Sequence, residues 1–311
     1  MTSVYSIKPS TSGVDVENCN VDSQALPAGY SGMVTVQTNG KFFLYAFDNT
    51  KKANATDVYE LTGSSPFIKK LNTGIKDLDG NAWDILKSFV LGNKPYVLAY
   101  ESKSGILGFY EVYDDATLSI PYKFVNRRDW PTQNFTEVSP FVSLGLLYVL
   151  CYDGVKGTVA VYSLSVISSS AGGIPPLNML NVWYHHWAKG WHVFSFFQLG
   201  QSNFFFKINT AKLNVNIDHL QDNPAMGSVE IGSWLQDLLP NALQVTLTSI
   251  IPWENGEPYL STYDGTTNDL NIYRIHADCQ GWTDLNTTTV DPATQLYAYR
   301  IGDTSYLLFY S

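Results

Sequence analysis

The chain has 311 residues and a formal net charge of −9, with only 15% charged residues but 14% aromatic ones. The acidic balance disfavours attraction to phosphate backbones and to anionic lipid, so we expect neither nucleic acid nor a membrane as partner. The abundance of Tyr, Phe and Trp beside few charges predicts a large buried core.

In chain order, six segments repeat one pattern, in which a Gly is followed three or four residues later by an apolar strand that starts with an aromatic residue. These predicted strands span 43–47, 96–100, 148–152, 204–208, 259–263 and 306–310. A strand precedes each Gly, at 33–37, 85–90, 138–142, 193–197, 248–251 and 296–301. A third strand follows at 58–61, 109–112, 161–164, 218–220 and 272–275, and a more polar fourth comes after it, as at 122–125 or 229–231.

The sixth repeat ends with the chain at Ser311, and its third strand is supplied by Val4-Tyr5-Ser6-Ile7 at the other end. Four strands per repeat and a period of about 50 residues are typical of propeller blades. The sequence therefore predicts an all-β fold: a six-bladed β-propeller with four-stranded antiparallel blades, whose N-terminal strand closes the last blade. We expect one domain, 1–311, with blades at roughly 30–72, 83–126, 135–187, 191–235, 245–288, and 290–311 plus 1–18.

The segment Trp187-Ala188-Lys189-Gly190-Trp191 is the fullest copy of a Trp-x-x-Gly-Trp motif that precedes the apolar strand, and Asn81-Ala82-Trp83 and Gly281-Trp282 are partial copies. This pattern resembles that of bacterial and fungal lectin-like propellers, including six-bladed lectins of the fucose-binding type. The resemblance implies the fold over the whole chain. The repeated Arg/Glu/Trp sugar sites of those lectins do not recur here at a fixed register.

Metal sites are suggested by two segments. His185, His186 and His192 lie close in sequence, but a strand sends adjacent side chains to opposite faces, and zinc sites favour a Cys or carboxylate partner. Residues 77–81 have the carboxylate spacing of a calcium loop without its Gly at the sixth place or its Glu at the twelfth. We therefore expect no metal.

The sequence contains no motif that is specific for a catalytic or cofactor-binding site. No nucleophile elbow, Walker loop, dinucleotide fingerprint or HExxH is present, so we expect no cofactor. Cys19, Cys151 and Cys279 cannot form a disulfide framework, although a Cys19–Cys279 bridge is conceivable.

The start of the chain shows no signal peptide, and the most apolar stretch, 141–152, is too short for a membrane span. We expect a soluble, cytoplasmic protein, with secretion open if a leader was removed, and the oligomeric state is left open.

The central funnel is where propeller ligands usually bind, and polar residues near the ends of the innermost strands differ from blade to blade. That divergence favours one asymmetric pocket, or a surface that binds nothing, over six equal sites. The predicted ligand-binding residues are Trp83, Asp84, Lys87, His185, Trp187, Trp191, His192, Thr246 and Tyr297.

Three functions fit this pattern. The first is a lectin-like propeller that holds a glycan or small organic molecule in an aromatic axial or inter-blade pocket. The second is a cofactor-independent cyclase or pericyclase, such as a hetero-Diels–Alderase, by resemblance to fungal biosynthetic propellers; its catalytic candidates are His192, Arg300, Glu137 and Tyr299. The third is a protein-interaction scaffold or toxin component.

Overall fold

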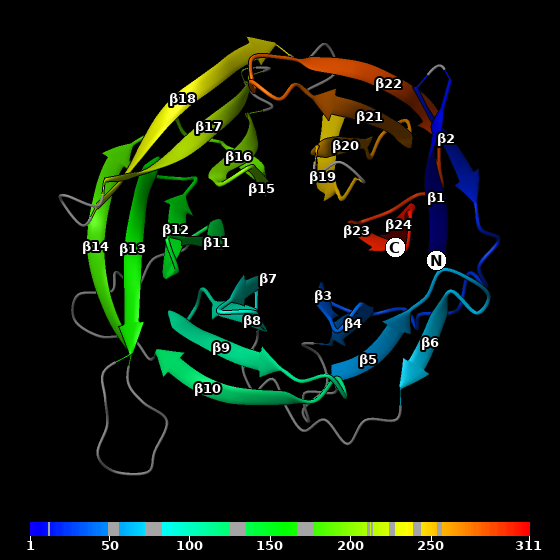
Figure 1. The fold of residues 1–311 in the computed structure, drawn as a ribbon, viewed down its shortest axis with the longest axis horizontal. Coiled ribbons are helices and arrows are strands. Elements are labelled where there is room, and N and C mark those ends of the chain that lie inside the picture. Colours follow the sequence, from blue (N-terminus) through cyan, green and yellow to red (C-terminus); the bar gives the residue numbers. More distant parts are fainter. Residues whose placement is uncertain are drawn as a thin grey trace.

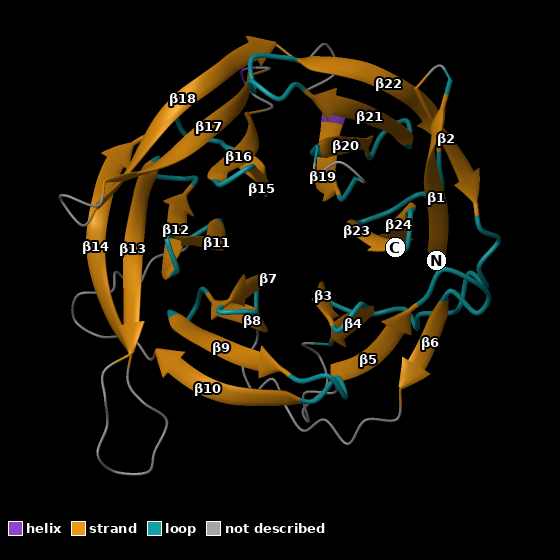
Figure 2. Ribbon diagram, in the orientation of Figure 1, coloured by secondary structure: helices purple, strands orange, loops and turns teal. Residues whose placement is uncertain are grey.

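The computed structural model describes residues 1–11, 13–48, 56–71, 83–124, 135–166, 177–209, 212, 214–223, 228–238, 244–253 and 257–311. Six antiparallel sheets of four strands stand around a central axis, which makes the protein a six-bladed β-propeller (Figure 1). Strands and loops make up nearly all of the described chain (Figure 2). No helix in that part is long and apolar enough to cross a membrane.

The first three blades follow the chain from the innermost strand to the outermost. Blade 1 consists of β3 (Gly32–Thr38), β4 (Lys41–Phe47), β5 (Thr56–Leu61) and β6 (Ile68–Leu71). Blade 2 consists of β7 (Ile85–Leu91), β8 (Lys94–Glu101), β9 (Ile106–Val112) and β10 (Leu118–Phe124). Blade 3 consists of β11 (Glu137–Ser143), β12 (Leu146–Asp153), β13 (Thr158–Val166) and β14 (Leu177–His186).

The last three blades repeat this order, and the sixth joins both ends of the chain. Blade 4 consists of β15 (His192–Leu199), β16 (Ser202–Asn209), β17 (Asn214–Asn223) and β18 (Ser228–Leu238). Blade 5 consists of β19 (Val245–Ile251), β20 (Tyr259–Asp264), β21 (Asp269–Ile275) and β22 (Trp282–Thr289). Blade 6 consists of β23 (Gln295–Ile301), β24 (Thr304–Tyr310), β1 (Thr2–Ser10) and β2 (Gly13–Asn18).

The ring is closed by pairing between the two ends of the chain, as the repeat predicts. Strand β1 lies antiparallel beside β24, with Tyr5 opposite Leu307. The Met1 ammonium donates to the Ser311 carbonyl at 2.6 Å, and the Ser311 N–H donates back to the Met1 carbonyl at 2.9 Å. The termini lie side by side in Figure 1. This pairing covers the edge of β24 that would otherwise be free.

Glycine occurs in the turn between the first two strands of a blade because the turn needs a left-handed backbone. Gly40 and Gly145 have φ values of 72° and 77°. Tight hairpin turns commonly need a backbone with positive φ, and a residue with a Cβ is disfavoured in that conformation.

The repeated aromatic residues are part of the buried core. In four blades the ring that opens the second strand stacks on a ring directly opposite on the first strand, with interplanar angles of 14–17°. These pairs are Phe89–Tyr96, Phe141–Tyr148, Phe197–Phe204 and Tyr299–Tyr306. We call the six predicted segments 43–47, 96–100, 148–152, 204–208, 259–263 and 306–310 the repeat strands. A second repeated ring lies on the third strand of five blades and pairs with the second residue of the repeat strand: Tyr59, Tyr110, Tyr162, Tyr273 and Tyr5. Blade 4 has Asp218 at that place.

Candidate functional site

A cavity of about 420 Å³ lies on the propeller axis and is lined by residues from all six innermost strands. These strands surround it because each of them contacts the next and β23 contacts β3. Small-molecule sites in proteins commonly occupy about 300–1,000 Å³, so the cavity has the size of a ligand site.

Strand pairing places one residue of each blade at the same height in this cavity. These six residues, which we call the middle layer, each lie opposite the third residue of the repeat strand. They are Val34, Lys87, Ser139, Ser195, Ser249 and Tyr297. The backbone positions are equivalent while the side chains differ, so the middle layer is chemically asymmetric.

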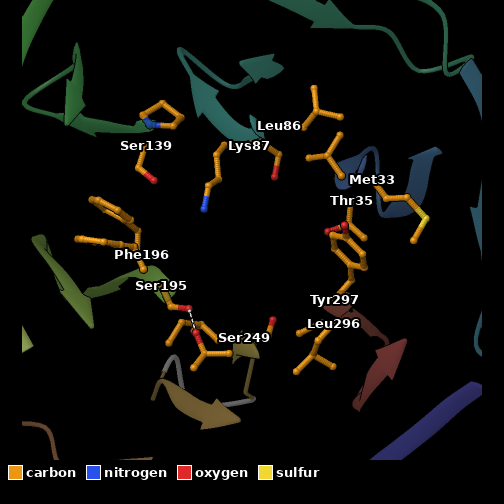
Figure 3. A pocket seen from close by; sticks show the side chains of 17 residues that line it. Met33, Thr35, Leu86, Lys87, Ser139, Ser195, Phe196, Ser249, Leu296 and Tyr297 are labelled. Atoms are coloured by element: carbon orange, nitrogen blue, oxygen red, sulfur yellow. Dashed lines mark hydrogen bonds between the residues drawn. The ribbon is translucent and has the colours of Figure 1, made fainter. Parts of the chain in front are cut away.

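Among the described residues that line the cavity, Lys87 is the charged one. Figure 3 shows its side chain extending toward the centre of the ring. Its Nζ lies 3.0 Å from Oε1 of Glu137, a carboxylate that is 7% exposed, and Ser139 donates its hydroxyl to the same oxygen. An ammonium has three donors, so the bond to Glu137 leaves others for a ligand.

Hydroxyl groups occupy much of the remaining lining. The hydroxyls of Ser195 and Thr248 lie 2.8 Å apart (Figure 3). Tyr297 donates its phenol to Oε1 of Gln295 at 2.6 Å, and burial raises the pKa of that phenol, so it stays neutral at physiological pH. Thr35 and Ser249 also line the cavity. Such groups both donate and accept hydrogen bonds, which suits a ligand with hydroxyls of its own.

Of the predicted ligand-binding residues, the structure brings Lys87 and Tyr297 to the cavity, and it pairs the predicted Glu137 with Lys87. Asp84 lies exposed just before β7 and accepts hydrogen bonds from the backbone N–H and the hydroxyl of Ser102. Thr246 is exposed near the start of β19. Neither of these two residues belongs to the lining.

Trp83, also predicted to bind ligand, is a core residue with 2% exposure. Its ring packs edge-on against Tyr110 at a centroid separation of 6.2 Å, within the cluster that joins blades 1 and 2. Filling the space between blades accounts for its position.

The predicted histidines lie at the junction of blades 3 and 4 rather than in the cavity lining. His185 and His186 are exposed at the end of β14, and His185 packs edge-on against Trp183. His192 starts β15, with its Nδ1 3.1 Å from the Gly190 carbonyl. Among the described residues, no three His, Cys, Asp or Glu side chains gather where they could hold a metal ion. The calcium-like segment 77–81 lies outside those residues.

Trp187 and Trp191 surround a lysine of the protein itself. The Nζ of Lys207 lies 3.6 Å from the ring centroid of Trp187 and 4.7 Å from that of Trp191. Lys207 is 2% exposed and forms an ion pair with the equally buried Asp218. Desolvation lowers the pKa of Lys207 and raises that of Asp218. The two tryptophans therefore already hold a cation inside blade 4.

The remaining catalytic candidates, Tyr299 and Arg300, lie on β23 outside the cavity lining. Tyr299 is completely buried, stacks on Tyr306, and its hydroxyl has no hydrogen-bond partner among the described residues. Arg300 donates from Nε to the Gly302 carbonyl at 3.0 Å and approaches the exposed Asp303, so it folds back on its own turn.

Sequence reasoning missed the three serines of the middle layer, Ser139, Ser195 and Ser249. Short polar residues carry no motif, and only the pairing register identifies them. The first two strands of a blade are joined by a tight hairpin, so the residue opposite the third residue of each repeat strand can be found by counting back through the turn. This count would have placed the three serines at equivalent positions. Lys207 and Asp218 were also missed, although a lysine within an apolar strand was a visible signal. All three cysteines are free thiols.

Comparison with known proteins finds no matching family model and no matching curated sequence. Solved structures do match. A periplasmic gluconolactonase of Pseudomonas aeruginosa has a TM-score of 0.50 at 11% identity, over 97% of this chain and 100% of its own. A candidate 6-phosphogluconolactonase of Bacteroides fragilis has a TM-score of 0.52 at 13% identity, over 96% of this chain and 85% of its own. At such low identity the likeness shows the propeller fold alone.

Proposed function

We propose that this propeller binds one small, hydroxyl-rich ligand, a sugar derivative or short glycan, in the axial cavity. The observation that carries the proposal is the asymmetric middle layer, in which Lys87, three serines and Tyr297 converge from five different blades. Hydroxyl groups and an ammonium supply donors and acceptors, and Phe194 and Phe196 in the same lining supply aromatic faces. The gluconolactonases named above act, by their names, on ligands of the same chemical class.

A single axial cavity whose six walls are not equivalent implies one ligand per chain. A lectin with equivalent inter-blade sites binds up to six. Calorimetric titration with a panel of methyl glycosides and sugar lactones therefore tests the proposal through the stoichiometry. We expect one site per chain, and a value near six contradicts the axial assignment.

Ser249→Leu tests the location of that site. Ser249 points into the cavity, so a leucine there fills the space that the ligand needs, and we expect binding to fall at least about tenfold. Thr246→Leu is the matched control because it makes the same kind of change on the same strand, at an exposed position outside the lining. Equal weakening by both variants places the site at the strand starts instead.

A cofactor-independent cyclase is the second candidate, and the Lys87–Glu137 pair favours it. The Lys87 donor in the cavity lining lies 3.0 Å from the buried carboxylate of Glu137, and the same lining holds Tyr297 and two phenylalanines. Mass spectrometry of bound compounds separates the candidates. Recovery of an unchanged ligand supports binding alone, and recovery of a cyclised product supports the enzyme.

A further inference from the structure

A second cavity, of about 280 Å³, adjoins the axial cavity and shares Pro140 and Phe196 with it. It lies farther along the same innermost strands of blades 2, 3 and 4, because its residues follow those of the middle layer on β7, β11 and β15. We call it the aromatic side pocket, and its walls include Phe89, Phe141, Phe196 and Phe197. The two cavities thus lie side by side and have these two residues as a common wall.

The chemistry of the side pocket is the opposite of that of the middle layer. None of the described residues lining it is charged. Phe141 and Phe196 lie nearly parallel, at 14° and a centroid separation of 6.3 Å, so they present adjacent ring faces. Phe196 is partly exposed, and its ring also stacks on Phe205 at a centroid separation of 5.2 Å, so a ligand contacts the part of the ring that the protein leaves uncovered. Aromatic faces of this kind stack on planar apolar groups.

The polar groups at the edge of the side pocket are occupied with each other. Gln198 donates from Nε2 to Oδ1 of Asn203 at 2.8 Å, and Asn203 donates from Nδ2 to the Val142 carbonyl at 3.1 Å. The bond from Asn203 to Val142 joins blade 4 to blade 3, and both bonds hold the side chains at the edge of the side pocket in place. The other described residues of the wall are Phe, Val and Pro, so an incoming group is recognised mainly by its apolar surface.

We infer that the ligand of the axial cavity is a glycoside or related conjugate with an aromatic aglycone, and that the aglycone binds in the aromatic side pocket. This inference rests on the proposed function, because the side pocket is a subsite of the same ligand. The volume is sufficient for a single ring, since a cavity of about 150 Å³ accommodates benzene. The described walls of this pocket come from blades 2, 3 and 4 alone, so the ligand lies in one orientation along the axis.

Matched pairs of methyl and phenyl glycosides test the inference on the unmodified protein. Each sugar, among glucose, galactose, mannose, fucose and N-acetylglucosamine, is titrated as both glycosides. We expect the phenyl glycoside of a binding sugar to bind at least about tenfold more tightly than the methyl one, because the ring leaves water for an apolar site. Equal affinities of the two overturn the inference and leave the proposed function standing, whereas no binding of any glycoside overturns both.

Two variants locate the aglycone. Val142→Phe fills the side pocket from its wall, and Phe196→Leu keeps apolar bulk while removing a ring face. Either change should reduce the preference for the phenyl glycoside to about twofold or less, with methyl glycoside affinity nearly unchanged for Val142→Phe. Leu146→Phe, at an exposed residue at the start of β12 in blade 3, is the control. A preference that survives both pocket variants, in proteins whose thermal melting is cooperative, places the aglycone elsewhere.

Discussion

The ammonium of Lys87 in blade 2 lies 3.0 Å from the carboxylate of Glu137 in blade 3, and this ion pair bridges two blades at the wall of the axial cavity. The two partners differ in exposure, at 32% for the lysine side chain and 9% for the glutamate. Glu137 thus depends on Lys87 for compensation of its charge, while Lys87 remains accessible to a ligand.

Lys87→Met should lower the free energy of unfolding by about 1–3 kcal/mol, because it leaves the buried Glu137 carboxylate without its cation. The double variant Lys87→Met, Glu137→Gln should recover part of that loss, since a neutral amide is less costly to bury. Urea unfolding of the single and double variants measures both effects. Additive losses in the double variant contradict the pairing.

Tyr299→Phe should leave the fold intact and raise the free energy of unfolding by up to about 1 kcal/mol. The Tyr299 hydroxyl is buried without a hydrogen-bond partner among the described residues, and burial raises its pKa, which reflects an apolar surrounding. The phenylalanine keeps the stack on Tyr306. Urea unfolding is the measurement, and a loss above 1 kcal/mol reveals a partner for the hydroxyl. Unchanged ligand affinity in the same variant separates Tyr299 from the site.

Ring closure by the termini predicts tolerance of circular permutation. A short linker from Ser311 to Met1, with new ends in the turn at Asn39–Gly40, should give a folded protein, because the original ends already hydrogen-bond to each other. Deletion of residues 1–10 should instead expose the edge of β24 and cause aggregation. Size-exclusion chromatography and circular dichroism compare the two. A stable monomer after the deletion contradicts closure by β1.

The fold was predictable from the sequence because its repeated positions are core positions. The aromatic residue at the start of each repeated apolar segment is buried in the core, so Tyr96 and Tyr148 recur three or four residues after a turn glycine. The site was less predictable because its serines are short side chains with no spacing of their own. Tyr299 shows the difficulty: it lies two residues from Tyr297 on the same strand, yet it stacks in the core while Tyr297 lines the cavity.

Alkaline unfolding should begin near pH 9–10 and steepen toward pH 12. Burial raises the pKa of Cys279 to about 11 and that of Tyr162 to about 12, and it raises the pKa of Tyr45 further. Above their ordinary pKa values of 9.0 and 10.0, these groups lose protons in the unfolded state but keep them in the folded state. The stability present below pH 9 is therefore lost as pH rises, by about 1.4 kcal/mol per pH unit for each such group.

Tyrosinate absorbance and circular dichroism, followed together from pH 8 to 12.5, check this expectation. Ionisation of the buried tyrosines should coincide with loss of the β-sheet signal. Smooth titration of all 20 tyrosines near pH 10 with the fold retained contradicts it.

The buried ion pair of blade 4, Lys207 and Asp218, stands at positions where other blades have uncharged residues. Where blades 1 and 2 have Ala46 and Ala99, blade 4 has Lys207. Where blades 1–3 have the repeated tyrosine, blade 4 has Asp218. Removing one partner of a buried ion pair strands the other charge, so Lys207→Ala or Asp218→Tyr alone should cost about 3–5 kcal/mol.

The double variant Lys207→Ala, Asp218→Tyr should restore most of that stability, because it removes both buried charges and returns blade 4 to the pattern of its neighbours. The new tyrosine ring then occupies the space beside Trp187 that the lysine side chain leaves. Urea unfolding of the two single variants and the double variant gives the coupling energy, which should be at least about 3 kcal/mol. A double variant as unstable as the sum of the two single ones shows instead that Lys207 is held mainly by the faces of Trp187 and Trp191, whose attraction the alanine removes.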